Sequence, residues 1–297
     1  MSEAWDDQFD RLHDTRPLYH NEDYWRFLIR EVWRIDQRPV RVVDFGCGYG
    51  WGGLFLLPML AAGSDYTGID RSAPLLAQGR ALFEGAPYAA RLVEGEVTST
   101  GFDEGQFDVA FAHAVLMHLP DPAAALAEMI RVTRDGGLVI TCDANHNAIN
   151  ALIHVHETNE QDHTPLSLFQ GMNTQIRAQH GADHNIGMKT PVLMRQAGLA
   201  DVQARVSDAV RLSFPPIETP EQERVFQAIC DDGMGGPGDE EGVRRAVAAL
   251  VKLGVPEAAA EAELRRELAN DYRRRGRDYH IVQPGLMTIS FGTVRKG

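Results

Sequence analysis

A mostly apolar run that ends in three alternate glycines constrains the fold of this chain more than any other feature. Residues 40–45 are largely apolar, and Gly46, Gly48 and Gly50 follow them directly. Glycine tolerates positive φ and carries no side chain, so backbone N–H groups in such a loop can approach a ligand closely. An apolar helical run then begins at Leu54, which places a helix N-terminus at the mouth of the loop. The stretch predicts a nucleotide-type binding corner at the carboxyl end of a sheet.

Strand and helix patterns alternate along the chain from residue 40 to residue 143, which is typical of a parallel, doubly wound sheet. Two further strand patterns follow near the end of the chain. The expected strands cover residues 40–45, 65–70, 91–97, 107–113, 138–142, 201–207 and 286–294.

The remaining segments suggest how the domain is elaborated. Residues 1–39 carry two helical patterns, which we interpret as a helical lid. A cofactor-binding domain is expected over residues 40–210 and 285–297, with a cap insertion at 145–189 and a mostly helical cap insertion at 211–284. Both insertions follow predicted strands, and ligand pockets form at the carboxyl edge of such sheets.

Composition excludes several classes of protein. The chain has 297 residues, 44% of them hydrophobic and 24% charged, which is ordinary for a globular protein. Its formal net charge of −13 disfavours a nucleic-acid partner, because an acidic surface repels phosphates. No apolar run reaches membrane-spanning length, so we expect no membrane partner. The isolated Cys47, Cys142 and Cys230 argue against a disulfide framework and predict the cytoplasm as the compartment.

Four ordered motifs within residues 40–143 carry a family resemblance. They are Asp44-x-Gly-x-Gly-x-Gly50 with Asp70 after the next strand, Glu94-Gly-Glu96, the stretch from Phe107 to Pro122, and Arg134-Asp-Gly-Gly137. Together they resemble the class I S-adenosylmethionine-dependent methyltransferases. The resemblance implies S-adenosyl-L-methionine as cofactor. It also implies an α/β fold: a doubly wound, mostly parallel seven-stranded sheet with an antiparallel last strand, to which helical insertions add a cap.

The resemblance also implies a set of cofactor-binding residues. Asp70 would accept hydrogen bonds from the ribose hydroxyls, and the loop backbone would lie against the amino-acid end of the cofactor. Glu96, where the family usually has Asp, or the backbone of Val97 would meet the adenine. The full expected set is Tyr19, Asp44, Gly46, Cys47, Gly48, Asp70, Arg71, Glu96, Val97, His113 and His118.

Several of these residues have a structural alternative. Asp44 and Asp70 could cap the helices that follow their strands. His118 could pack against the helix that begins at Pro122. These alternatives stay open at the level of the sequence.

Histidines beyond the fifth strand are the candidate general bases, which are needed only if the methyl acceptor must lose a proton. His146 directly follows that strand and is the first choice, and His154 is the second. The others are His156, His163, His180 and His184. His154 and His156 have a spacing seen in metal sites, but no second tight pair accompanies them, so we expect no metal.

The function expected from the sequence is methyl transfer to oxygen, nitrogen or carbon of a small-molecule acceptor. A nicotinamide-dependent oxidoreductase is one alternative, although its G-x-G-x-x-G fingerprint would require glycine where this chain has Trp51. A non-catalytic S-adenosylmethionine-binding regulatory protein is another. The oligomeric state is left open, with a homodimer as one option.

Overall fold

The computed structural model describes residues 8–156, 168–179, 181–232, 237–269 and 276–297. The chain forms two compact units. The first comprises Met1–Ala144, Asn185–Ser207 and Met287–Gly297, and the second comprises Asn145–His184 and Asp208–Leu286. The chain therefore leaves the first unit twice, once after residue 144 and once after residue 207.

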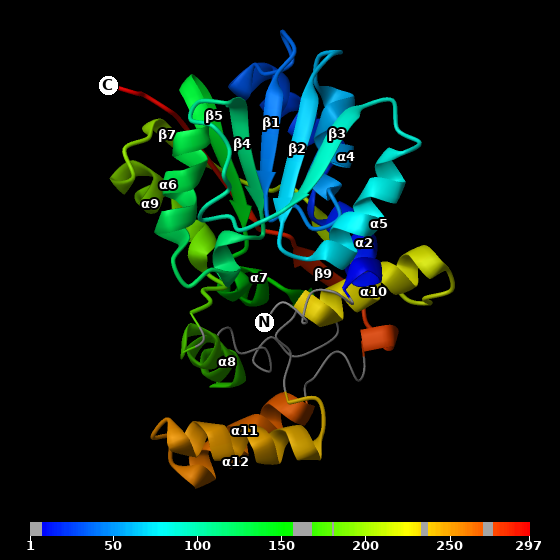
Figure 1. The fold of residues 1–297 in the computed structure, drawn as a ribbon. Helices are drawn as coiled ribbons and strands as arrows, with labels where there is room; N and C mark the ends of the chain where they lie inside the picture. Colours follow the sequence, from blue (N-terminus) through cyan, green and yellow to red (C-terminus); the bar gives the residue numbers. More distant parts are fainter. Residues whose placement is uncertain (1–7, 157–167, 180, 233–236, 270–275) are drawn as a thin grey trace. The chain divides into compact units, whose positions relative to one another are not determined.

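A seven-stranded sheet organises the first unit. Its strands are β1 (Arg41–Phe45), β2 (Asp65–Asp70), β3 (Ala89–Glu94), β4 (Phe107–His113), β5 (Thr133–Asp143), β7 (Ala200–Val206) and β10 (Thr288–Thr293). Their order in the sheet is β3-β2-β1-β4-β5-β10-β7 (Figure 1). Only β10 runs antiparallel to its neighbours, β5 and β7. The predicted α/β sheet with its antiparallel last strand is confirmed.

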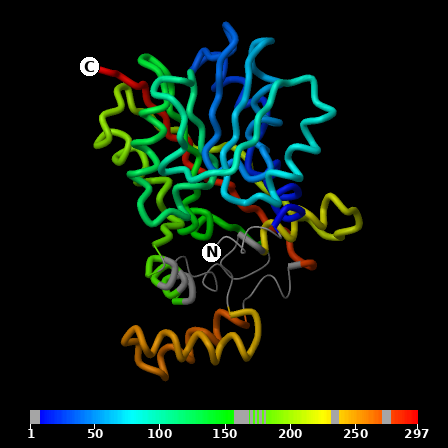
Figure 2. Tube along the Cα trace, viewed as in Figure 1, coloured from blue at the N-terminus to red at the C-terminus, as the bar shows by residue number. Residues whose placement is uncertain are grey.

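Helices and short helical turns surround this sheet. They are α2 (Phe9–Thr15), η1 (Arg16–Tyr19), α3 (Glu22–Phe27), η2 (Leu28–Trp33), α4 (Trp51–Leu56), η3 (Leu57–Met59), α5 (Ala73–Phe83), η4 (Leu116–His118), α6 (Pro122–Val132), η6 (Ile186–Met188) and α9 (Thr190–Gln196). The trace in Figure 2 shows β10, in red, crossing the first unit.

The central strands are apolar on both faces because both faces are covered. Val42 of β1 belongs to a core with Trp25 of α3 and Leu56 of α4. Its neighbour Val43 points the other way, into a core that includes Leu126 of α6. Successive side chains of a strand point to opposite faces, so a strand buried on both sides becomes a continuous apolar run.

Two helix starts follow the sequence signals. The Ser72 side chain accepts a hydrogen bond from the Leu75 N–H at the start of α5. The Asp121 side chain accepts one from the Ala124 N–H at the start of α6. In each case a proline follows in the first turn, where its missing N–H costs nothing.

The third strand differs from the prediction. It covers Ala89–Glu94 rather than residues 91–97. Gly95 donates its N–H to the Asp70 carbonyl, and Glu96 pairs only in an isolated bridge with Ser99. Glu96 and Val97 therefore lie in a turn beyond the strand, a position from which their side chains and backbone can face a ligand.

The second unit contains a small sheet that the sequence did not reveal. Its strands are β6 (His154–Val155), β8 (Val210–Ser213) and β9 (Ile281–Pro284), in the order β6-β9-β8. In β8 the apolar Val210 and Leu212 are exposed, whereas Arg211 and Ser213 are buried. Because of this inverted alternation, β8 shows no half-buried strand pattern in the sequence.

The helices of the second unit are α7 (His146–Ala151), α8 (Leu168–Gln179), α10 (Pro220–Asp232), α11 (Glu240–Lys252), α12 (Glu257–Ala269) and the turn η7 (Gly276–Asp278). Met172 of α8 packs in one apolar cluster with Leu250 of α11 and Leu264 of α12. Phe226 and Ile229 of α10 form another with Val155 and Ile281 of the small sheet. The unit thus has apolar clusters of its own.

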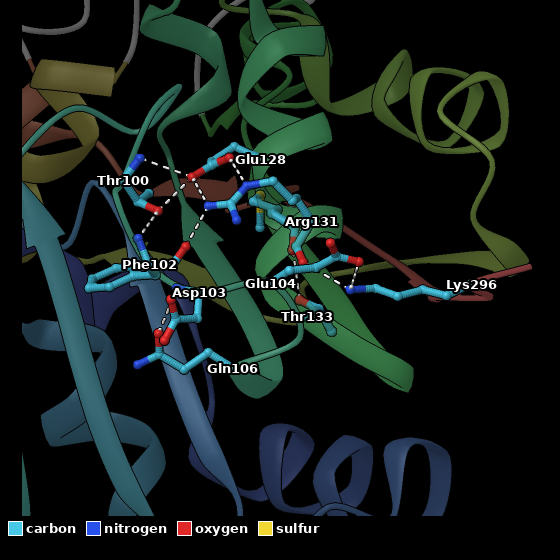
Figure 3. Close-up of polar contacts among 10 residues, drawn as sticks. Thr100, Phe102, Asp103, Glu104, Gln106, Glu128, Arg131, Thr133 and Lys296 are labelled. Carbon is cyan, nitrogen blue, oxygen red and sulfur yellow. Dashed lines mark hydrogen bonds and ion pairs between the residues drawn. The ribbon is translucent and has the colours of Figure 1, made fainter.

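An ion-pair cluster fastens the loop between β3 and β4 to α6 (Figure 3). Glu128 accepts hydrogen bonds from the Arg131 guanidinium and from both the backbone N–H and the hydroxyl of Thr100. Arg131 also donates to the Phe102 carbonyl at 2.7 Å. The hydrogen bond from Arg131 is the main cause that lowers the pKa of Glu128, to about 2.

Glu128→Gln should lower the free energy of unfolding by about 1–2 kcal/mol at pH 7, because the neutral amide is a weaker acceptor for Arg131. A carboxyl with a lowered pKa in the folded state adds stability above its unfolded-state pKa, and that stability is lost as the pH falls through the folded-state pKa. The difference between wild type and variant should therefore shrink as the pH falls from about 4.5 toward 2. Denaturant unfolding at several pH values measures it.

Glu104→Gln is the matched control. Glu104 pairs with Lys296 in the same region, but its side chain is 70% exposed. Its loss should change stability by less than about 0.5 kcal/mol. Equal losses in the two variants, or a pH-independent loss in Glu128→Gln, would contradict the assignment.

Candidate cofactor site

The glycine loop between β1 and α4 has the conformation that its sequence predicts. Gly46, Gly48 and Gly50 have φ angles of 65°, 56° and 83°. A Cβ atom on Gly46 would lie 2.6 Å from a methyl carbon of Val115. Positive φ and close contact together make any larger residue at Gly46 unfavourable.

The carboxylate of Asp70 holds this loop in place. Its Oδ2 atom accepts the Gly48 N–H at 2.8 Å, and its Oδ1 atom accepts the Ser72 N–H at 2.8 Å. Asp70 therefore has a structural role at the start of α5, as expected if it caps the helix that follows its strand. It also lines a cavity, so the two roles do not exclude each other.

The cavity lies where β1, β2 and β4 end. It encloses about 700 Å³ when the open space at its mouth is included. Its lining comes from the N-terminal helices, the glycine loop, the end of β2, the turn after β3 and the segment after β4. The residues are Leu12, Arg16, Gly46, Gly48, Asp70, Arg71, Leu75, Gly95, Glu96, Val97, Ala114, Val115, His118 and Leu119.

Seven of the residues predicted for cofactor binding lie in this lining: Gly46, Gly48, Asp70, Arg71, Glu96, Val97 and His118. The chain positions of these residues span more than 70 residues, so the fold brings them together. Tyr19, Asp44, Cys47 and His113 are outside the lining.

Asp44 lies behind the loop. It is only 2% exposed, and its Oδ2 atom accepts a hydrogen bond from the Tyr66 hydroxyl at 2.6 Å. Burial raises the pKa of Asp44 to about 7, although the Tyr66 hydrogen bond and the charge of Arg16 oppose the rise. Its Oδ1 atom has no hydrogen-bond partner within the described parts of the chain.

The Cys47 side chain points away from the cavity. Its thiol donates to the Gly48 carbonyl at 3.6 Å, and a Cβ on Gly68 would meet its sulfur at 2.6 Å. Cys47 therefore packs between loop and sheet, and only its backbone remains available to a ligand. Burial raises the pKa of its thiol well above the usual value.

Arg16 lines the cavity but is absent from the set of cofactor-binding residues predicted from the sequence. Its guanidinium contacts Nδ1 of His113 and donates to the His113 carbonyl at 3.3 Å. His113 is in turn 2.7 Å from His20, between their Nε2 atoms. Burial lowers the pKa of Arg16 as well as those of both histidines. The Arg16-Pro17 pair at a short helical turn was the available signal, but many surface turns share it.

The candidate bases belong to the second unit. His146 begins α7, and its N–H donates to the His184 carbonyl at 3.1 Å. Their rings are 5.1 Å apart, between centroids. His154 lies exposed in β6 opposite Val282. His163 and His180 lie outside the described residues.

Comparisons with known proteins agree with this geometry. Residues 43–141 match a family model described as a methyltransferase domain. The ubiquinone biosynthesis O-methyltransferase of Pseudomonas fluorescens (strain Pf0-1) is 35% identical over 147 residues, which are 48% of this chain and 58% of that protein. Its counterpart in Thiobacillus denitrificans (strain ATCC 25259 / T1) is 32% identical over 158 residues, 51% of this chain and 62% of that protein. The chain spans about three fifths of the length of these curated relatives.

Solved structures show the same fold. The YcgJ protein of Bacillus subtilis has a TM-score of 0.52 at 15% identity, covering 92% of this chain and 100% of its own. A methyltransferase-like protein of Bacillus halodurans C-125, BH2331, has a TM-score of 0.51 at 14% identity, covering 90% and 99%. At these identities the likeness concerns the fold alone.

The sheet order, the glycine loop and the acidic end of β2 define a nucleotide-binding α/β domain with a reversed last strand. Residues 43–141 of this domain match the methyltransferase-domain model, in agreement with the resemblance of the motifs to class I S-adenosylmethionine-dependent methyltransferases. The prediction from the motifs is confirmed, and the match favours it over the nicotinamide alternative.

Within the described ranges, no helix is both long enough and apolar enough to cross a lipid bilayer.

Gly46→Ala should reduce the free energy of unfolding by about 2–4 kcal/mol. The positive φ is unfavourable for alanine, and its Cβ would clash with Val115. Gly101→Ala is the matched control: its φ is 71°, but a Cβ there meets nothing within 4 Å. The control should lose only about 1–2 kcal/mol. Equal losses in denaturant unfolding would show that the contact with Val115 is unimportant.

Proposed function

We propose that this protein is an S-adenosylmethionine-dependent methyltransferase that acts on a small organic acceptor. The observation that carries the proposal is the single cavity shared by the glycine loop, Asp70 and Arg16. It combines a close backbone approach, a charged acceptor and a cation at the carboxyl edge of the sheet. That combination suits a ligand with a ribose, an adenine and an amino-acid end.

Asp70 would receive the ribose hydroxyls. Both of its oxygens accept one backbone N–H each, which orients the carboxylate and leaves further lone pairs for the ligand. Hydrogen bonds to a charged acceptor contribute about 1.5–3 kcal/mol each. Glu96 and the backbone of Val97, in the turn beyond β3, would face the adenine.

Arg16 would bind the carboxylate of the amino-acid end. Its guanidinium is fixed at the end of β4 by the His113 carbonyl and ring. The neighbouring strands β1 and β4 part at this point, because the order of the sheet reverses direction there. Asp44, whose Oδ1 atom has no partner in the described chain, stands behind the loop at the same point and would support the ammonium side.

S-adenosylmethionine supplies an electrophilic methyl group that an acceptor lone pair can attack in line with the departing sulfur. The task left to the protein is to align the two reactants and to exclude water. Alignment can lower the activation free energy by up to roughly 7–11 kcal/mol. His118 and Leu119 line the cavity after β4, where they would border the reacting atoms.

The second unit is the proposed source of acceptor recognition. Its two segments follow β5 and β7, and the chain returns to the first unit at Asn185 and again at Met287. The relatives named above are O-methyltransferases of ubiquinone biosynthesis, which favours a hydroxyl acceptor. The net charge of −13 disfavours nucleic acid as an acceptor.

Asp70→Ala should weaken binding of S-adenosylhomocysteine at least about ten-fold, since one decade corresponds to about 1.4 kcal/mol. Isothermal titration calorimetry measures the affinity, and circular dichroism checks the fold. Asp65→Ala, at the opposite end of the same strand, is the control and should bind like the wild type. Unchanged affinity in Asp70→Ala would refute the ribose assignment.

The acceptor can be sought by incubating the protein with methyl-labelled S-adenosylmethionine and metabolite extracts, with products read by mass spectrometry. If His146 is the base, His146→Ala should lose label transfer by about 100-fold or more while its affinity for S-adenosylhomocysteine is kept. Wild-type transfer by the variant would remove His146 from the candidate bases. A protein that binds the cofactor and labels nothing would favour the non-catalytic alternative.

A further inference from the structure

A hydrogen-bonded chain of three side chains lies next to the cavity in the first unit. It runs from Arg16 to His113 and from His113 to His20. His113 and His20 are 5% and 6% exposed. The aromatic rings of Trp51, Trp25 and Phe55 surround His20.

The chemistry of arginine fixes which nitrogens carry protons. A guanidinium has only donors, so Nδ1 of His113 must accept and its proton must be on Nε2. That Nε2–H then donates to Nε2 of His20 at 2.7 Å. His20 therefore carries its own proton on Nδ1, an atom with no hydrogen-bond partner in the described chain.

Both imidazoles are neutral in this arrangement. Burial, and after it the charge of Arg16, lowers the pKa of His20 to about 3 and that of His113 well below its usual value. No carboxylate of the described residues lies within ion-pair distance of Arg16. Among the carboxylates, Asp44 has the largest electrostatic effect on the pKa of Arg16. The guanidinium is thus held in place without being neutralised.

A carboxylate partner would have fixed Arg16 equally well but would have cancelled its charge. Neutral imidazole acceptors leave the full charge available to an anion in the cavity that Arg16 lines. We propose that His113 and His20 are positioning residues that hold Arg16 as the receptor for the carboxylate of the cofactor. This inference rests on the proposed function, because it takes the cofactor to be an amino-acid thioether or sulfonium.

The same cluster could be considered as a metal site. The donor atoms of His20, His113 and Cys142 all lie within 4.8 Å of one another, and the Cys142 sulfur is 4.0 Å from Nε2 of His20. A metal would need the lone pair of the His113 nitrogen that bears the proton here, and it would need a thiolate. Burial raises the pKa of the Cys142 thiol well above the usual value, and the Arg16 cation stands beside the cluster. The hydrogen-bonded chain accounts for the geometry better.

Two ligands test the inference by calorimetry. S-adenosylhomocysteine has the amino-acid end, whereas 5′-methylthioadenosine shares the adenosine and the sulfur but has no carboxylate. His113→Phe should weaken the first ligand about ten-fold or more and the second less than about two-fold. His113→Asn, whose side-chain oxygen can replace Nδ1 as acceptor, should recover most of the lost affinity.

His20→Phe keeps the ring among its aromatic neighbours but removes the acceptor, and we expect a loss of about three- to ten-fold for S-adenosylhomocysteine alone. His20→Gln, which keeps a side-chain acceptor, should restore the affinity for S-adenosylhomocysteine. Nitrogen-15 spectra of the wild-type imidazoles should show Nε2–H in His113 and Nδ1–H in His20. The opposite tautomers would overturn the proposal.

Two further outcomes are decisive. Equal weakening of both ligands in the histidine variants would indicate a merely structural role, and one zinc or copper ion per chain, lost in His20→Phe, would indicate a metal site. Either result overturns the positioning role. Failure of the wild-type protein to bind S-adenosylhomocysteine would instead refute the proposed function, so the two failures are distinguishable.

Discussion

The carboxylate of Asp70 is the junction on which the cavity depends. It joins the glycine loop after β1 to the start of α5 through two backbone hydrogen bonds. The loop needs such a restraint, because its glycines lose more conformational entropy on folding than other residues do. The same restraint aims a charged acceptor at the cavity. The restraint of the loop and the proposed recognition of the cofactor ribose therefore depend on one side chain.

The charged side chains that line the cavity are of both signs. Asp70 and Glu96 bring negative charge to the lining, and Arg16 and Arg71 bring positive charge. A ligand with separated ammonium and carboxylate groups meets both signs in such a lining. The overall charge of −13 does not reveal this local balance, since most of the acidic residues lie elsewhere.

Much of the first unit could be predicted because its strands are buried on both faces and its turns use glycine, proline and acidic residues in recognisable places. β4 and the starts of α5 and α6 lie where their patterns place them. The end of β3 could not be predicted, because residues up to Val97 continue the apolar and charged alternation after the chain has turned. β8 gave no signal, since it buries Arg211 and exposes Val210.

The site was predictable where it rests on local motifs and not where it rests on distant contacts. Gly46, Gly48 and Asp70 belong to one strand–loop–strand signature, so their meeting follows from the fold class. Arg16 meets His113 across almost a hundred residues of chain, and no periodic pattern encodes that contact. Cys47 was assigned to the site by its place in the loop, but its side chain turns toward the sheet.

The reversed strand β10 has a consequence for the order in which the molecule can fold. Thr288 pairs with Asp143 on one side and with Val206 on the other. β10 therefore lies between β5 and β7, which do not pair with each other. The whole of the second unit precedes β10 in the chain. Until that last strand has been synthesised, β5 and β7 present unpaired edges, and such edges invite pairing with other chains. A nascent chain therefore carries an incomplete sheet until β10 has been made, which happens only after the whole second unit.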